Sequence, residues 1–436
     1  MLKRLQALDK PIEVIIVGAG AMGEGLFYQC HTTLGLKVNV LCDLDLNKCI
    51  ACAEENSVSY SIVSDYYELW DTIQRGELAI CQDGNLAASA PGDVFIESTN
   101  TIREGVEFCL TAIENELHLV MMNAEVDLAF GPLLLKKCQD NELTYTSCDG
   151  DQHCVLKRII DDITLWGFDV RMAGNIKGFL DTYSNPTKII PEADKRSLDY
   201  KMATAYTDGT KLHIEMALLA NALGYLPNGP HMTGPRLSHA KDTLEHFNFQ
   251  QYDPALKDLY NANRLLTGAP VVDYILGSQP DGGVFVVGYC DNAYQKRMMK
   301  YYKMGSGPFY VFYRPYHLCH VEAVECIVSA VLDGESLLQP DQGYLTNVFA
   351  YAKKDLEKGQ TLDGLGGYTC YGLIESVRDQ EPSQIINNTG DGLPICLAEN
   401  VVLNKDISKD SRIRLQDVNL DVSSPVFDLY QKACML

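Results

Sequence analysis

The sequence predicts an α/β protein in which a doubly wound parallel sheet is followed by an α+β substrate domain and a C-terminal domain of short strands. Three observations favour this fold class. A glycine-rich turn joins the first apolar run to a helical stretch. Apolar runs and helical stretches then alternate to about residue 150, and short strands with turns replace this pattern in roughly the last hundred residues. We place the domains at residues 1–152, 153–338 and 344–436.

The glycine-rich turn predicts a dinucleotide site. The β-branched run at residues 12–18 is typical of a buried parallel strand, and it leads into G-x-G-x-x-G and a helical stretch at residues 24–30. In this arrangement Gly18 allows the tight turn, Gly20 lets the backbone approach a pyrophosphate, and Gly23 lets helix and strand pack closely. Ala21 and Met22 lie within the same turn and join the expected cofactor-binding set.

An acidic residue follows the second apolar run. Asp43 stands 20 residues after Gly23, at the place where a carboxylate accepts hydrogen bonds from the adenosine ribose. A carboxylate there repels a 2′-phosphate, so Asp43 favours NAD over NADP, although the cofactor remains NAD or NADP. The alternative is a loop or helix-capping aspartate, because Asp45 lies beside it.

Further apolar runs at residues 93–99, 119–123 and 143–147 complete the predicted sheet, with helical segments at 103–115 and 132–140. In a doubly wound sheet the ligand crevice lies at the carboxyl ends of the strands. We therefore place Thr99, Asn100, Asn123 and Glu125 near the nicotinamide end of the cofactor.

Composition limits the partners and the compartment. The chain has 436 residues with 36 Lys plus Arg against 58 Asp plus Glu, a net charge of −22, which argues against nucleic acid as a partner. The longest charge-free stretch, 216–235, contains three Pro and three Gly, so no membrane span is expected. Fifteen scattered Cys and a charged N-terminus indicate a cytoplasmic protein with reduced thiols.

Cysteine and histidine patterns give no metal site. Cys49 and Cys52 form a C-x-x-C in a helical segment without a second ligand pair nearby. His317 and His320 flank Cys319, again without partner ligands in the neighbouring sequence. We expect these to be ordinary helix residues and assign no metal ligands, and a requirement for a divalent metal stays open.

A cluster of cations lies in the middle of this acidic chain. Six stand within the 35 residues from Lys177 to Lys211, which suits an anionic substrate such as a phosphate or carboxylate. The alternative is that these side chains pair with local acids on a solvated face. The residues assigned to substrate binding are Lys177, Lys188, Arg196, Arg236 and Arg314.

Longer runs carry a family resemblance. Residues 93–99 and 120–126 look like the nucleotide domain of homoserine dehydrogenases, and residues 149–152, 173–180 and 206–212 narrow the likeness. The chain resembles the homoserine-dehydrogenase-like oxidoreductases with a C-terminal SAF domain, the group of 1-deoxy-D-xylulose-5-phosphate reductoisomerase-like (DRL) enzymes. This resemblance implies a Rossmann-type nucleotide domain, and a helix at about 317–333 that returns to it.

The resemblance also implies a function. It indicates an NAD(P)-dependent oxidoreductase acting on a small anionic hydroxy or keto compound, with a phosphorylated one favoured, in isoprenoid precursor synthesis. It also implies a homo-oligomer, either dimer or tetramer. One alternative is a homoserine-dehydrogenase-like dehydrogenase of a polyol or hydroxy acid. Another, from a different class, is a nucleotide-sensing or assembly protein without catalysis.

The resemblance points to catalytic residues as well. Homoserine dehydrogenases place a catalytic lysine after the strand that here spans residues 120–123, but this chain has Asn123-Ala-Glu125 there, so homoserine is not the expected substrate. A second lysine of that family opens a helix shortly after an aspartate, and Lys211 and Asp208 match these positions. We expect Lys211 in the first turn of a helix, with its pKa lowered by the helix dipole, and Asp208 either holding the ammonium or capping the helix. Lys201, Glu192 and Lys195 complete the candidate catalytic set.

Two segments near the C-terminus resemble each other. Residues 351–362 and 402–413 each run from a strand into a polar turn, as in the SAF type of β-clip module. Few ionisable side chains converge there. We therefore expect an accessory, assembly or lid domain that the nucleotide domain does not need for folding.

Overall fold

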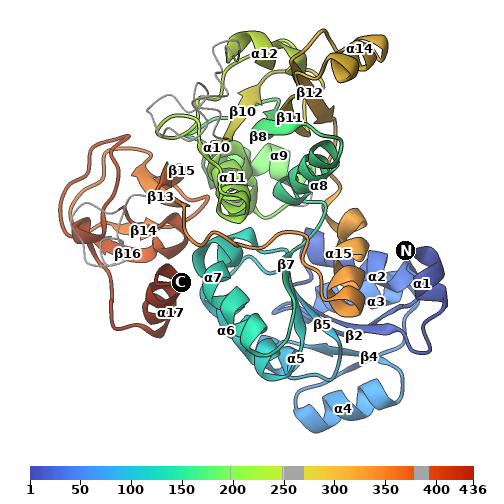
Figure 1. Cartoon of the computed structure of the whole chain (residues 1–436). Helices are drawn as coiled ribbons and strands as arrows, with labels where there is room; N and C mark the ends of the chain where they lie inside the picture. The colour runs from blue at the N-terminus through green and yellow to red at the C-terminus, as the bar shows by residue number, and fades with distance from the viewer. Residues whose placement is uncertain (197, 248, 250–269, 378–391) are drawn as a thin grey trace.

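The computed structural model describes residues 1–196, 198–247, 249, 270–377 and 392–436. Figure 1 shows an N-terminal region in blue to cyan, a middle region in green to yellow, and a C-terminal region in orange to red beside both. Within the described residues, no helix is both long enough and apolar enough to cross a bilayer.

The N-terminal region is a seven-stranded parallel sheet in the order β3-β4-β2-β1-β5-β6-β7. The predicted doubly wound α/β fold is confirmed. Its strands are β1 (Ile12–Val17), β2 (Leu36–Cys42), β3 (Tyr60–Ile62), β4 (Leu78–Cys81), β5 (Val94–Glu97), β6 (His118–Met121) and β7 (Tyr145–Ser147). The order reverses between β1 and β5, and the crevice at their carboxyl ends is where such sheets bind ligands.

Helices cover both faces of this sheet, and polar side chains fix where most of them begin. They are α1 (Leu2–Gln6), α2 (Ala21–Thr32), α3 (Leu46–Glu55), α4 (Tyr66–Gln74), α5 (Gly84–Ala88), α6 (Arg103–Glu114) and α7 (Ala124–Asp140). The helix expected at 132–140 begins earlier, at Ala124, because Asn123 caps it by accepting from the Glu125 and Val126 amides. Pro132 therefore lies inside the helix rather than at its start.

The middle region contains a five-stranded mixed sheet in the order β12-β11-β8-β10-β9. Its strands are β8 (Asp169–Lys177), β9 (Leu226–Pro227), β10 (Val271–Leu276), β11 (Val284–Tyr289) and β12 (Phe309–Arg314). The helices around it are α8 (Gln152–Leu165), α9 (Pro186–Asp194), α10 (Tyr200–Asp208), α11 (Thr210–Leu223), α12 (Thr243–His246) and α14 (Ala293–Tyr301). Then α15 (Cys319–Asp333) packs against α2, where Cys326 and Ile327 share a hydrophobic cluster with Phe27.

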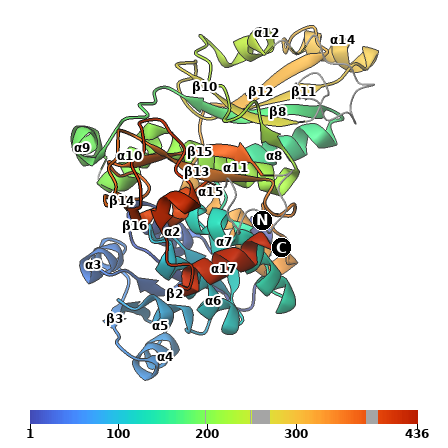
Figure 2. The ribbon, with the colours of Figure 1, turned by 90° about the vertical axis from the view of Figure 1, so that its left-hand side faces the viewer.

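The C-terminal region is built from two small antiparallel sheets. One pairs β13 (Thr346–Ala352) with β15 (Cys370–Ser376), and the other joins β14 (Thr361–Asp363), β16 (Glu399–Leu403) and β17 (Val418–Asn419). The chain ends in α17 (Pro425–Cys434), which packs against α7 of the nucleotide domain. Figure 2 shows this region lying across the join between the other two.

The C-terminal region packs closely against the other two regions. Helix α11 packs against both β13 and β15, and a single hydrophobic cluster includes Phe130 of α7, Leu219 of α11 and Phe349 of β13. The buried Asn221 side chain also accepts hydrogen bonds from the Leu345 and Thr346 amides. The three regions therefore share one core.

Candidate active site

The glycine turn has the shape that a pyrophosphate requires. Gly18 has φ +99°, and a Cβ there would lie 2.6 Å from the Ser98 carbonyl oxygen. A Cβ on Gly23 would lie 1.7 Å from the Gly18 oxygen, so helix and strand meet too closely for a side chain. A Cβ on Gly20 would meet no described atom within 4 Å, which leaves open space at the amino end of α2. Ala21 is exposed and Met22 half-buried in the first turn of that helix. These residues fit a bound dinucleotide phosphate.

Asp43 follows β2 at the same edge of the sheet. Its Oδ2 accepts from the Ala19 amide at 2.8 Å, and its Oδ1 accepts from the Asp45 amide at 2.9 Å. The residue that caps α3 is Asp45, so the helix-capping alternative for Asp43 is wrong. Asp43 therefore braces the glycine turn.

The polar residues after β5 and β6 largely bond within the protein. Thr99 donates its backbone amide to the buried Glu97 carboxylate at 3.1 Å, and burial raises the pKa of Glu97 to about 7. Asn123 caps α7 and donates to the Thr101 carbonyl at 2.9 Å. Asn100 is exposed and lines a cavity with Glu125 and Lys201.

A buried ion pair lies at this edge of the nucleotide domain. Lys211, in the first turn of α11, places its Nζ 3.0 and 3.2 Å from the two carboxylate oxygens of Glu125 in the first turn of α7. Each side chain is only 5% exposed. The middle region thus places the Lys211 ammonium against α7, the helix that follows β6, where we expect the nicotinamide end of the cofactor.

The expected lowering of the Lys211 pKa is wrong. Burial by itself lowers this pKa, but the negative charges of Glu125, Asp151 and Glu215 outweigh burial and raise the pKa above its ordinary value. Lys211 is therefore a stable cation, suited to polarising an oxygen rather than to accepting a proton.

Other ionisable side chains gather round Lys211. Glu215 lies one turn along α11, fully buried, and its carboxylate accepts from the Asn175 amide of β8 at 3.1 Å. Burial, and then Asp151, raise the pKa of Glu215 to about 7, while Lys177 and Lys211 oppose the rise. The site thus holds a carboxyl group that gains and loses a proton near neutral pH.

The expected contact between Asp208 and Lys211 is wrong. Asp208 instead forms an ion pair with Lys353 of the C-terminal region at 2.8 Å, with the two side chains 0% and 4% exposed. It also accepts from the Thr210 amide at 2.8 Å, so a capping contribution exists. Gly209, with φ +91°, ends α10 and starts α11, and this sharp turn sends the two side chains to different partners.

Most of the remaining predicted cations pair with acids on the surface. Lys195 and Arg196 lie 2.7 and 4.0 Å from Glu192 on an exposed face of α9. Lys177 is half-buried, and its charge acts on Glu215 of the buried site. The others are placed as follows: Lys188 by Asp181 at 3.7 Å, Lys201 by Glu399 at 2.6 Å, Arg314 by Glu322 at 2.8 Å, and Arg236 before β10.

Several site residues were missed by the sequence analysis. Glu215 carries a local signal, because it stands four residues after Lys211 and so on the same face of a helix. Asp151 is the last residue of the Asp-Gly-Asp run, but no pattern in the neighbouring sequence predicts that it lies near α11. Lys353 has no local signal, since its partner lies far away in the chain.

One family model matches the middle of the chain. The family model "Oxidoreductase DRL, catalytic domain" matches residues 150–323, which include Asp151, Lys211 and Glu215. No curated protein matches the sequence.

Solved structures show distant similarity. 1-Deoxy-D-xylulose 5-phosphate reductoisomerase from Zymomonas mobilis in complex with NADPH is 16% identical with a TM-score of 0.33, covering 48% of this chain and 57% of its own. The match thus spans little more than half of that reductoisomerase. A probable dehydrogenase from Thermotoga maritima is 9% identical with a TM-score of 0.44, covering 76% and 92%. A putative myo-inositol dehydrogenase from Sinorhizobium meliloti 1021 is 13% identical with a TM-score of 0.40, also covering 76% and 92%.

The family match covers the helix that carries the buried ammonium, and the glycine turn of the N-terminal region fits a dinucleotide. Residues 150–323 of this chain therefore resemble the catalytic domain of the DRL oxidoreductases.

Proposed function

We propose that the protein catalyses hydride transfer between a nicotinamide dinucleotide and a small anionic hydroxy or keto compound at the site around Lys211. The observation that carries this proposal is the buried Lys211–Glu125 pair beside the carboxyl end of the nucleotide-binding sheet. Burying two charges costs free energy, so a pair held at a ligand crevice is more readily explained by chemistry than by stability.

During reduction, the carbonyl carbon of the substrate receives a hydride and the carbonyl oxygen receives a proton. A dihydronicotinamide held at the glycine turn would supply the hydride to the carbonyl carbon. The Lys211 ammonium would face the carbonyl oxygen and stabilise the negative charge that develops there. The proton that this oxygen needs comes from Glu215, whose pKa of about 7 suits a proton donor at neutral pH.

The anionic end of the substrate would meet Lys177. This side chain is half-buried at the end of β8, and its charge acts on Glu215 and His317. Within the described residues no acidic side chain forms an ion pair with Lys177. A cation whose charge is not neutralised in this way, beside a buried acid–base site, suits a phosphate or carboxylate group.

The finer assignment is reductive isomerisation of 1-deoxy-D-xylulose 5-phosphate, a step in isoprenoid precursor synthesis. The DRL family match supports it. A polyol or hydroxy-acid dehydrogenase would use the same Lys211 and Glu215 chemistry without a carbon-skeleton rearrangement. We further propose NAD as the preferred cofactor, from Asp43, an SAF-type accessory role for residues 344–436, and a homo-oligomer.

A substrate panel tests the proposal. Deoxyxylulose phosphate, homoserine and tetronates are each combined with NADH, NADPH and their oxidised forms, and absorbance at about 340 nm is followed. Turnover that Lys211→Met abolishes and Lys195→Met retains supports the site, because Lys195 is an exposed, surface-paired lysine. Dinucleotide binding without turnover on any substrate would favour the nucleotide-sensing alternative.

A further inference from the structure

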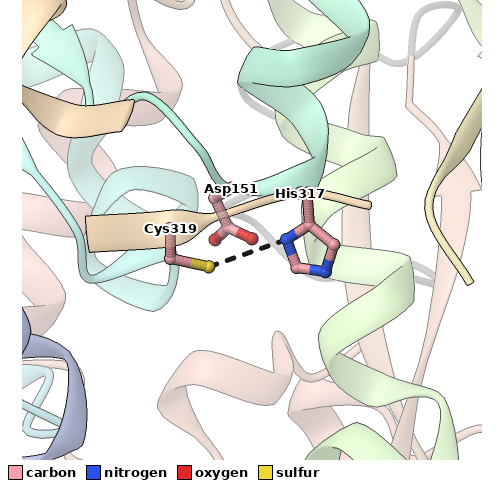
Figure 3. Close-up of side chains that lie close together, drawn as sticks. All are labelled: Asp151, His317 and Cys319. Atoms are coloured by element: carbon pink, nitrogen blue, oxygen red, sulfur yellow. Dashed lines mark hydrogen bonds between the residues drawn. The ribbon is translucent and has the colours of Figure 1, made fainter. Parts of the chain in front are cut away.

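Three side chains from two distant parts of the chain converge at the start of α15. Asp151, His317 and Cys319 each offer one ligand atom, and these atoms lie within 4.8 Å of one another (Figure 3). His317 Nδ1 and Cys319 Sγ are 3.6 Å apart. Two ligands at about 2.1 and 2.3 Å from a tetrahedral ion are separated by roughly 3.5 Å, so this spacing already matches one shared ion.

Backbone packing holds the two segments together. Asp151 caps the amino end of α8, while His317 and Cys319 stand at the start of α15. Between them, Gly150 has φ +89°, and a Cβ there would lie 2.5 Å from the carbonyl oxygens of both Leu318 and Cys319. The convergence therefore depends on a contact that only glycine permits.

The environment of His317 provides a second, independent observation. Its Nε2 lies 3.0 Å from Nε2 of Gln152, a side chain that is only 4% exposed. The Gln152 Oε1 is buried and has no hydrogen-bond partner among the described residues. Turning this amide by 180° lets Oε1 accept from Nε2–H and satisfies the buried oxygen. The Nδ1 lone pair then faces Cys319 and Asp151, as in histidine ligands whose far nitrogen is held by a second residue.

In the described part of the chain, Asp151 lacks a counter-charge in direct contact. Its carboxylate accepts one hydrogen bond there, from its neighbour's amide, Gln152 N, at 2.9 Å, and forms no ion pair. A buried carboxylate is normally paired or bound to a metal. His317 Nδ1 also lies 3.2 Å from the Gly150 carbonyl oxygen. A carbonyl oxygen only accepts hydrogen bonds, so this contact forms when Nδ1 carries a proton and is given up when Nδ1 binds a metal ion.

We propose that Asp151, His317 and Cys319 form a binding site for a divalent transition-metal ion of the zinc, cobalt or iron(II) class. Carboxylate, imidazole and thiolate together suit such an ion better than magnesium, which prefers oxygen ligands. Because three protein side chains contribute, the remaining position is open to water or to a ligand from the adjoining Lys211 site. The proposal goes beyond the oxidoreductase function and does not depend on it.

Metal content tests the proposal directly. Purified full-length protein is equilibrated with Zn²⁺ or Co²⁺, dialysed, and measured by inductively coupled plasma mass spectrometry. We expect about one ion per chain for the wild type and less than about a tenth of that for Cys319→Ser and His317→Ala. His320→Gln is the matched control, because His320 neighbours Cys319 on α15 but its ring lies against Gly25 of α2. This control should keep the wild-type content.

Cobalt adds a readout of the ligand itself. Co²⁺-loaded wild type and His320→Gln should show a thiolate-to-cobalt charge-transfer band that Cys319→Ser lacks. Substoichiometric metal in folded wild type, or full retention in Cys319→Ser and His317→Ala, would overturn the site. Normal turnover in metal-free protein would overturn a catalytic use of the ion but not its binding. The metal test and the substrate panel can therefore fail separately.

Discussion

The structure has two buried lysine–carboxylate pairs, Lys211–Glu125 and Lys353–Asp208. We expect the first pair to support catalysis and the second to stabilise the fold. The structure assigns Asp208 to Lys353 rather than to Lys211, so Asp208→Asn should weaken stability and spare the chemistry. This substitution removes the carboxylate charge and leaves the Lys353 ammonium buried against two carbonyl oxygens, those of Ser184 at 2.7 Å and Gly367 at 2.8 Å.

The magnitude follows from this environment. Removing one partner of a buried ion pair costs about 3–5 kcal/mol, because the remaining charge is left uncompensated. Two carbonyl acceptors and the amide oxygen of the introduced asparagine soften the loss, so we expect about 3 kcal/mol for Asp208→Asn. Lys353→Met should cost a similar amount. The double variant should lose less than the sum of the two, because neither charge is then buried alone.

Urea-induced unfolding followed by circular dichroism measures this loss, and turnover per folded molecule is measured in parallel. Glu192→Gln is the control, since it removes a surface partner of Lys195 and should leave the unfolding midpoint unchanged. Unchanged stability of Asp208→Asn, together with a fall in turnover of about tenfold or more, would refute the reasoning and return Asp208 to the catalytic set.

Four other outcomes are expected. Lys211→Met should lower turnover by about 10²-fold or more while dinucleotide affinity, measured by fluorescence titration, stays nearly unchanged; normal turnover would contradict the proposed role. The pKa of Glu215 is raised from 4.5 to about 7, so the rate of reduction should fall as pH rises through about 7. The folding stability that the Glu215 proton contributes is present at acidic pH and is lost over the same rise in pH. Glu215→Gln should remove both pH dependences, and a pH profile identical to the wild type would exclude Glu215. Gly20→Val should abolish dinucleotide binding in a folded protein, because its side chain would fill the space left for the pyrophosphate. A chain ending at Tyr344 should fail to unfold cooperatively, because α7 and α11 would lose the surfaces that cover them; a sharp urea transition would show that the N-terminal regions fold alone.

The local parts of this fold could be predicted from the sequence. The glycine turn, the alternation of strands with helices and the first-turn position of Lys211 all depend on neighbouring residues, and the structure has each of them. Helix starts were less accurate where two signals competed, as at α7, where the Asn123 cap prevails over Pro132.

The partners of the buried charges could not be predicted in the same way. Spacing suggested that Asp208 and Lys211 meet, but the turn at Gly209 separates them, and each finds a carboxylate or ammonium on another region. His317 and Cys319 lacked a third ligand in the nearby sequence because Asp151 comes from the far end of the matched segment. Such pairings are set by tertiary packing, which a local pattern does not contain.

The Asp208–Lys353 pair also affects the order in which the chain matures during synthesis. Lys353 leaves the ribosome long after Asp208, together with the strands that cover α11. Until then, burying Asp208 would leave a carboxylate without its counter-charge, so the nascent middle region gains little from closing early. The nucleotide sheet can form first from its βα units, whereas the middle region gains the counter-charge of Asp208 and the strands that cover α11 only late in translation. Ribosome stalling before residue 353 should therefore leave the middle region open to proteases while the nucleotide-binding sheet is already protected.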